Sequence, residues 1–102
     1  YMPSCRKEEF NIFQNFVIQV DHRDELRQYL LEHRIKTAIH YPIPIHRQPA
    51  ASCIPLGKDR LARVEAQAGR ILSLPIHPYL SNSQIDRVSH TINKFYLERD
   101  RI

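Results

Sequence analysis

Glycine is scarce in this chain, which contains only Gly57 and Gly69 among 102 residues. Two glycines cannot build the glycine-rich loops that hold phosphates, so P-loop and dinucleotide-binding motifs are excluded. The two cysteines, Cys5 and Cys53, are too few for a disulfide framework and form no close pair of the zinc-binding kind. They could pair in principle, but reduced thiols and a cytoplasmic location fit this cysteine usage best.

Long apolar runs are also absent from the sequence. No run approaches the ~18 residues that span a bilayer, and the charged first ten residues contain no signal-peptide core. We therefore expect no membrane partner. The chain opens on Tyr1 rather than on methionine, which indicates a piece of a longer polypeptide.

Charge of one sign is not gathered anywhere along the chain. The 15 Lys and Arg residues and 11 Asp and Glu residues give a net charge of +4, and acids stand beside bases in the charged stretches 6–9, 23–25 and 98–101. Nucleic-acid binding requires a concentrated basic face, so we expect no nucleic-acid partner. The apolar fraction of 42% and the length of 102 residues indicate one globular domain.

Hydrophobic periodicity predicts six elements in the order β-α-β-loop-α-β-α. We expect strands over residues 14–20, 35–40 and 71–76, and a first helix with Asp21 as its N-cap that ends near Arg34. A second helix should begin near Asp59, and the last should follow a capping box of Ser81 and Gln84. The second helix is expected to bury Leu61, Val64, Ala68 and Leu72, and the last to bury Ile85, Val88, Ile92 and Phe95.

These elements predict an α+β fold, a small open sheet of three short strands with helices covering one face. Residues 1–13 are interpreted as a charged lead-in and residues 14–102 as the domain itself.

Polar residues with chemical potential are concentrated in one loop, between the second strand and the second helix. His40, Tyr41, His46, Arg47 and Gln48 lie within nine residues, and three prolines, Pro42, Pro44 and Pro49, stiffen the segment. Binding groups are often found on rigid loops, although a histidine and a tyrosine beside a strand are commonly packed and hydrogen-bonded instead.

Other chemistry has weaker support in the sequence. A zinc site of His40, His46 and His77 lacks the usual ligand spacing, so we expect no metal. Ser52 and Cys53 have histidines nearby but no orienting third group. The lysines Lys7, Lys36, Lys58 and Lys94 stand in polar contexts, unlike the desolvated amine of Schiff-base chemistry.

Two segments carry a family resemblance. IKTAIHYPIPIHRQPA, and ILSLPIHPYLSNSQIDRV about twenty residues later, resemble the DegT/StrS family of pyridoxal-phosphate (PLP)-dependent sugar aminotransferases. The matching positions are Ile35, Thr37, His40, Tyr41, Pro42, Pro44, His46, Gln48, Leu72 to Pro75, Pro78 and Asp86 to Val88. The resemblance extends from about Gln14 to Phe95, and Glu65 falls where the family has a glutamate on its second helix.

The resemblance implies the C-terminal small domain of an enzyme that moves an amino group, usually from glutamate, to a keto nucleotide sugar. Such an enzyme is a homodimer that binds PLP, and its large N-terminal domain holds the Schiff-base lysine. Nothing in this chain matches that lysine motif, so no catalytic residue is expected here and the chain alone should not transaminate. His40, Tyr41, His46 and Gln48 are expected to bind the sugar or phosphate oxygens of the substrate.

The sequence departs from the family at two places. Arg34 stands where a glycine usually ends the first helix, at a cost of ~1 kcal/mol if the residue is left-handed. Family members usually carry an insert with an aromatic residue and a glycine after the Gln-Pro step. In this chain the corresponding residues, 52–58, form a shorter and altered segment. Two alternatives remain open: a stand-alone binding or regulatory module with the same fold, and a PLP-dependent sugar dehydratase of the same family.

Overall fold

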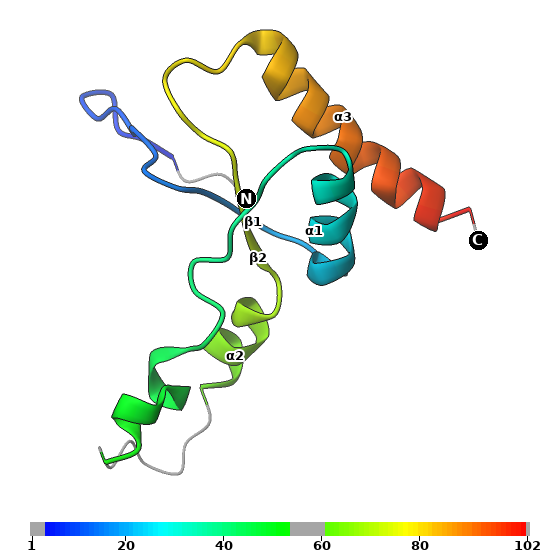
Figure 1. Cartoon of the computed structure of the whole chain (residues 1–102). Coiled ribbons are helices and arrows are strands. Elements are labelled where there is room, and N and C mark those ends of the chain that lie inside the picture. The colour runs from blue at the N-terminus through cyan, green and yellow to red at the C-terminus, as the bar shows by residue number, and fades with distance from the viewer. Residues whose placement is uncertain (1–3, 54–60, 102) are drawn as a thin grey trace.

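The computed structural model describes residues 4–53 and 61–101, and a two-stranded antiparallel sheet lies at its centre (Figure 1). Strand β1 (Phe16–Gln19) pairs with β2 (Ile71–Leu74), with Phe16 opposite Leu74 and Ile18 opposite Leu72. Because side chains alternate along a strand, these four apolar residues share one face of the sheet. The opposite face is more open, with Val17 45% exposed. The predicted α+β class with an open sheet is confirmed.

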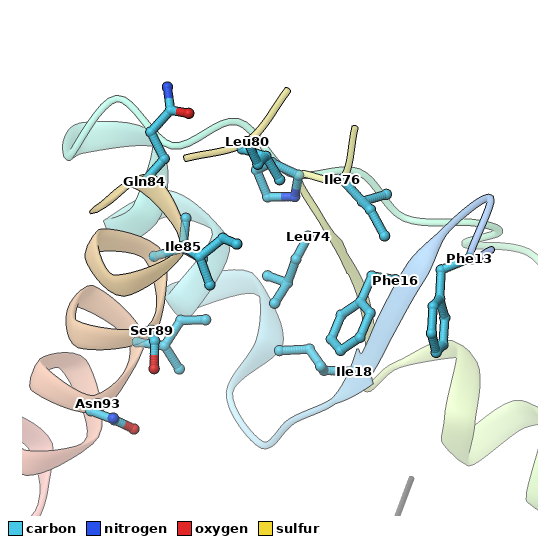
Figure 2. Close-up of a pocket in the computed structure, with 13 residues that line it drawn as sticks. Phe13, Phe16, Ile18, Leu74, Ile76, Leu80, Gln84, Ile85, Ser89 and Asn93 are labelled. Carbon is cyan, nitrogen blue, oxygen red and sulfur yellow. The ribbon is translucent and has the colours of Figure 1, made fainter. Parts of the chain in front are cut away.

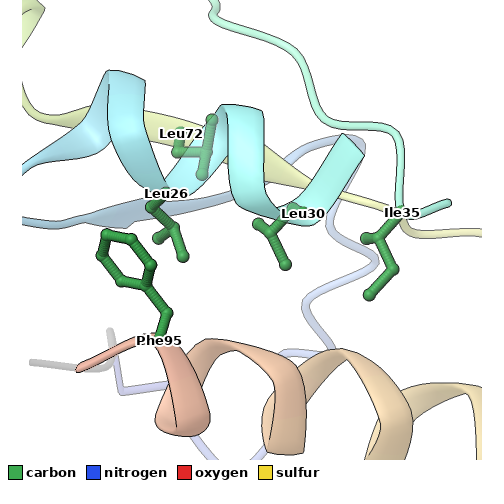
Figure 3. Packing of buried hydrophobic residues seen from close by; sticks show 5 residues of the cluster. All are labelled: Leu26, Leu30, Ile35, Leu72 and Phe95. Carbon is green, nitrogen blue, oxygen red and sulfur yellow. The ribbon is translucent and has the colours of Figure 1, made fainter. Parts of the chain in front are cut away.

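Two helices supply the packing partners of the sheet. Helices α1 (Arg23–Glu32) and α3 (Asn82–Arg99) contact each other, and α1 also contacts β2. The core between them consists of five buried residues (Figure 3): Leu26, Leu30, Ile35, Leu72 and Phe95. Burial of each large aliphatic side chain stabilises the fold by roughly 1.5–3 kcal/mol, so this small cluster supplies much of the favourable free energy.

The predicted start of the last helix and most of its predicted buried face are confirmed. Ser81 Oγ accepts a hydrogen bond from the Gln84 amide at 3.2 Å, and the Gln84 side chain accepts from the Ser81 amide at 3.0 Å. Val88, Ile92 and Phe95 pack on the core. Ile85 does not, because it is 50% exposed above the sheet.

The start of α1 differs from the prediction. The N-cap is His22 in a left-handed conformation, with no side-chain cap, rather than Asp21. The Asp21 carboxylate instead pairs with Arg70 at 3.1 Å, which draws it toward the chain that enters β2.

The predicted strand over residues 35–40 is wrong except at Ala38, which makes an isolated bridge to Ser73. Ile35 lies in the core at the end of α1, and Pro42 lacks a backbone donor, so only a short stretch can pair with β2. The third strand is therefore reduced to one residue at the edge of the sheet.

Helix α2 (Ala62–Ala68) and two 3-10 turns, η1 (Ile45–Arg47) and η2 (Pro49–Ala51), form an arm that extends away from α1 and α3 (Figure 1). The predicted start of the second helix near Asp59 lies outside the described residues. Its predicted inner face is wrong, since Leu61 and Val64 are 49% and 43% exposed and Leu72 belongs to β2. The helix lies beyond the core, so the predicted apolar face of α2 is largely exposed among the described residues.

Residues 4–13 precede the sheet and carry a turn closed by the Glu9 amide and the Arg6 carbonyl at 3.0 Å. Residues 4–13 contain neither a helix nor a strand. Across both described ranges, no helix combines the length and apolar character that crossing a membrane requires.

Candidate functional site: the 40–48 loop

The loop of residues 40–48 starts at the edge of the sheet, where a serine anchors it. Ala38 and Ser73 exchange backbone hydrogen bonds at 2.8 and 3.1 Å. The Ser73 hydroxyl also shares a hydrogen bond of 2.8 Å with His40 Nδ1. Ser73 is 5% exposed, so the His40 ring is fixed against a buried group and its Nε2 atom is left for another partner.

Prolines and a short turn set the course of the loop beyond His40. Pro44 precedes η1, where the Arg47 amide donates to the Pro44 carbonyl at 2.9 Å. The Gln48 side chain donates back to the Ile43 carbonyl at 3.3 Å. With the backbone torsion of each proline restricted, the loop has few alternative conformations to lose when it binds a ligand.

One carboxylate joins the loop to α2. Glu65 Oε1 lies 3.1 Å from His46 Nε2, and the Arg47 guanidinium reaches both Glu65 oxygens at 3.0 and 3.1 Å. The side chains of His46 and Glu65 are only 16% and 18% exposed. An ionised carboxylate can only accept hydrogen bonds, so His46 donates through Nε2. The Nδ1 atom of His46 is then the ring nitrogen that can face a ligand.

The exposed side of the loop forms a shallow hollow of about 250 Å³ against α2 and β2. Tyr41 and Gln48 line it from the loop, and Gln67 lines it from the helix. Tyr41 is 73% exposed, and its ring meets the His40 ring edge-on, with the ring centroids 5.5 Å apart. Apolar walls with a few polar groups are typical of sites that bind organic ligands.

The predicted site residues divide into two kinds. Tyr41 and Gln48 border the hollow, whereas His40 and His46 each use one ring nitrogen inside the protein. His77 belongs to another segment, where it packs against Tyr79 with ring centroids 6.5 Å apart. Among the described residues, no three histidine, cysteine or acidic side chains lie where they could share a metal ion.

Sequence reasoning did not single out Ser73, and it noted Glu65 only as a family position. A serine between leucines in an otherwise apolar strand was the available signal for Ser73, since a buried hydroxyl requires a partner. Glu65 could not be paired from sequence, because its partners lie 18 and 19 residues away across a loop.

A second concave surface lies between the sheet and α3. This groove of about 540 Å³ is lined mainly by apolar side chains, among them Phe13, Phe16, Leu74, Ile76 and Ile85 (Figure 2). Its walls come from β1, the residues that flank it and β2, and from α3, and it lies on the face of the sheet that carries Phe16, Ile18 and Leu74.

A similar fold occurs in an aminotransferase of known structure. The crystal structure of a DegT DnrJ EryC1 StrS aminotransferase from Brucella abortus matches 79% of this chain, at 34% identity and a TM-score of 0.74. The fold is thus that of an aminotransferase lobe. The model of the DegT/DnrJ/EryC1/StrS aminotransferase family matches residues 2–93. The chain belongs to this family, as the resemblance implied.

Two curated relatives are nucleotide-sugar transaminases by name. One is dTDP-3-amino-3,6-dideoxy-alpha-D-galactopyranose transaminase of Aneurinibacillus thermoaerophilus, 32% identical over 93% of this chain. The other is dTDP-3-amino-3,4,6-trideoxy-alpha-D-glucose transaminase of Streptomyces venezuelae, 36% identical over 92% of this chain. The chain spans only about a quarter of these relatives, 26% and 25% of their lengths.

Proposed function

We propose that the complete protein is a PLP-dependent aminotransferase that transfers an amino group from glutamate to a keto nucleotide sugar. Residues 14–102 would form its small domain, and residues 1–13 would lead in from a preceding large domain. The observation that carries this proposal is the family match over residues 2–93 together with relatives named as nucleotide-sugar transaminases.

The groove beside α3 supports the existence of a missing domain. Phe13, Phe16, Ile76 and Ile85 line a largely apolar surface that lies open among the residues the structure describes. Soluble proteins rarely leave such a surface open, and the relatives are about four times as long, which leaves room for a large domain that would cover it. We assign the groove to contact with that domain, within a homodimer.

The described lysines of this chain do not fit the cofactor. PLP, when bound, supplies the electron sink for amino transfer and is held through a lysine. Lys7, Lys36 and Lys94 are exposed, and Lys94 pairs with Glu98 at 3.6 Å. None of these described lysines is a desolvated amine, which supports the proposal that the Schiff-base lysine belongs to the large domain. We assign no catalytic step to the described residues.

The contribution of this chain is to position the substrate. Tyr41 and Gln48 would contact the nucleotide sugar from the rim of the hollow, and His40 and His46 would offer their remaining ring nitrogens to its hydroxyl or phosphate oxygens. Groups held in a stiff loop restrict the motion of a bound substrate and so raise the chance of a productive geometry.

The test is a product assay with the complete protein, PLP, glutamate and dTDP-linked keto sugars, followed by mass spectrometry. Conversion of the keto sugar to an amino sugar supports the proposal. Loss of water from the sugar without gain of nitrogen identifies a dehydratase instead. Failure to bind PLP or to change any of the sugars favours the stand-alone binding module.

A further inference from the structure

Glu65 holds the candidate loop from a different element of the chain. Its carboxylate lies between His46 and Arg47, two consecutive residues of η1, while Glu65 itself belongs to α2. Within the described residues, these contacts are the side-chain hydrogen bonds that link the 40–48 loop to α2.

We propose that Glu65 is a positioning residue that sets the orientation of the 40–48 loop for the nucleotide sugar. This inference rests on the proposed function and assigns a role that acts through other residues. Glu65 touches His46 and Arg47, and these in turn fix the turn that precedes Gln48.

The geometry of the contact supports a directional restraint rather than a loose surface ion pair. Arg47 meets both carboxylate oxygens through its Nε and Nη2 atoms, an arrangement that fixes the plane of the guanidinium. The His46 ring bonds one of the same two oxygens, and its side chain is only 16% exposed. Two donors from adjacent residues thus restrain the rotation of η1 about its own axis.

The other end of the loop is restrained independently. His40 is anchored to Ser73 on β2, so the segment between the two anchors carries Tyr41 across the hollow. Releasing the Glu65 end would leave Tyr41 and Gln48 attached to the protein but free to change their separation. The expected defect is therefore weaker substrate binding, with the fold retained.

The experiment compares the complete enzyme with its Glu65→Gln variant in two separate half-reactions. Glutamine keeps the size of the side chain but loses the charge and one acceptor oxygen. We expect KM for the nucleotide sugar to rise about tenfold or more, because small misplacements of binding groups have effects of this size. The rate of the half-reaction with glutamate should change less than about twofold, because the proposed role of Glu65 concerns only the loop contacts with the nucleotide sugar.

Asp21→Asn is the matched control, since it also removes a carboxylate from an arginine but lies outside the loop. It should leave both half-reactions unchanged. A second comparison uses Arg47→Gln and the double variant with Glu65→Gln. If Glu65 acts through Arg47, the two effects on KM combine to less than their product.

The outcomes separate this inference from the proposed function. A wild-type enzyme that forms no amino sugar removes both. A wild-type enzyme that is active, with an unchanged nucleotide-sugar KM in Glu65→Gln, overturns only the role of Glu65. Equal losses in both half-reactions also overturn it, because they indicate general destabilisation. Multiplicative effects with Arg47→Gln overturn it as well, because they show that the two residues act independently.

Discussion

Arg34 adopts the backbone conformation that its glycine-like position requires. Its φ angle is 61°, and it closes α1 with two hydrogen bonds, from the Arg34 amide to Leu31 at 2.9 Å and from the Ile35 amide to Leu30 at 2.8 Å. These bonds and the packing of Ile35 with Leu30 form a Schellman motif. The motif persists although a side chain in the left-handed region is strained.

Replacing Arg34 with glycine should therefore stabilise the chain. We expect Arg34→Gly to raise the free energy of unfolding by about 0.5–1 kcal/mol, since the gain from relieved strain exceeds the added entropy of the unfolded chain. Chemical denaturation of this chain measures the change. The control is Arg27→Gly in the middle of α1, which should lower stability by about 1 kcal/mol. Equal losses in both variants would contradict the account of residue 34.

Tyr96 makes the stability of the chain sensitive to alkaline pH. Burial, and next the nearby Asp21 carboxylate, raise the pKa of the Tyr96 phenol above the ordinary value of 10.0. The unfolded chain therefore releases this proton first, and the folded state loses stability as the pH rises above 10.0. Below that pH the contribution is fully present.

We expect the pH dependence to weaken in Tyr96→Phe, which keeps the ring but removes the titrating group. The variant also loses the hydrogen bond to the Asp21 carbonyl at 2.7 Å, so it should be less stable at neutral pH. Denaturation curves between pH 7 and 11 measure both effects, on a scale of about 1 kcal/mol for the hydrogen bond. An identical slope above pH 10.0 in both proteins would disprove the assignment to Tyr96.

At the scale of elements, α3 depends on the capping box at its start. Ser81→Ala removes the acceptor for the Gln84 amide, so the free energy of unfolding should fall by about 0.5–2 kcal/mol. Ser89→Ala, on an exposed position of the same helix, should change it by less than about 0.5 kcal/mol. Thermal unfolding of the two variants gives the comparison, and equal effects would exclude a capping role for Ser81.

The elements that were predictable from sequence are those whose signals are local. The capping box of α3 and the stripe of Val88, Ile92 and Phe95 are set by spacing along one helix, and the structure has both. The prediction of a strand over residues 35–40 was wrong because pairing in this segment depends on where α1 ends and on where the loop with Pro42 begins. The prediction of a buried face on α2 was wrong because periodicity indicates an apolar face but does not indicate whether other residues cover it.

The candidate site shows the same division. The 40–48 loop was recognisable from its clustered polar residues and prolines, and the resemblance supplied its expected role. Its anchors were not recognisable, because Ser73 and Glu65 meet the loop only through tertiary contacts. Whether Tyr41 and Gln48 contact a substrate remains a prediction.

At the scale of the molecule, the chain is more extended than a self-sufficient domain of its size. Its radius of gyration is 16.7 Å, and its extents are 49, 46 and 21 Å. A compact domain of about 100 residues has a radius of gyration near 13 Å. The arm that carries the 40–48 loop and the groove beside α3 both expose apolar side chains among the described residues, as contact with the proposed large domain would require.

The groove predicts different effects for two exposed aliphatic residues of α3. Ile85 lines the groove and is 50% exposed, whereas Leu97 is 60% exposed and lies outside it. In the complete protein, Ile85→Gln should lower stability by about 1–2 kcal/mol through lost burial against the large domain, and Leu97→Gln by much less. Thermal unfolding of the complete protein measures this. A Leu97→Gln effect as large as that of Ile85→Gln would contradict domain contact at the groove.

The central claim is that this chain works as the small domain of a PLP-dependent sugar aminotransferase. The most direct measurement is the intact mass and PLP content of the polypeptide that carries this sequence in its native cell. The account predicts a product about four times as long as this chain, matching the relatives, with PLP bound through a lysine outside these 102 residues. A stable product of about 12.1 kDa without PLP would contradict it and leave the stand-alone binding module.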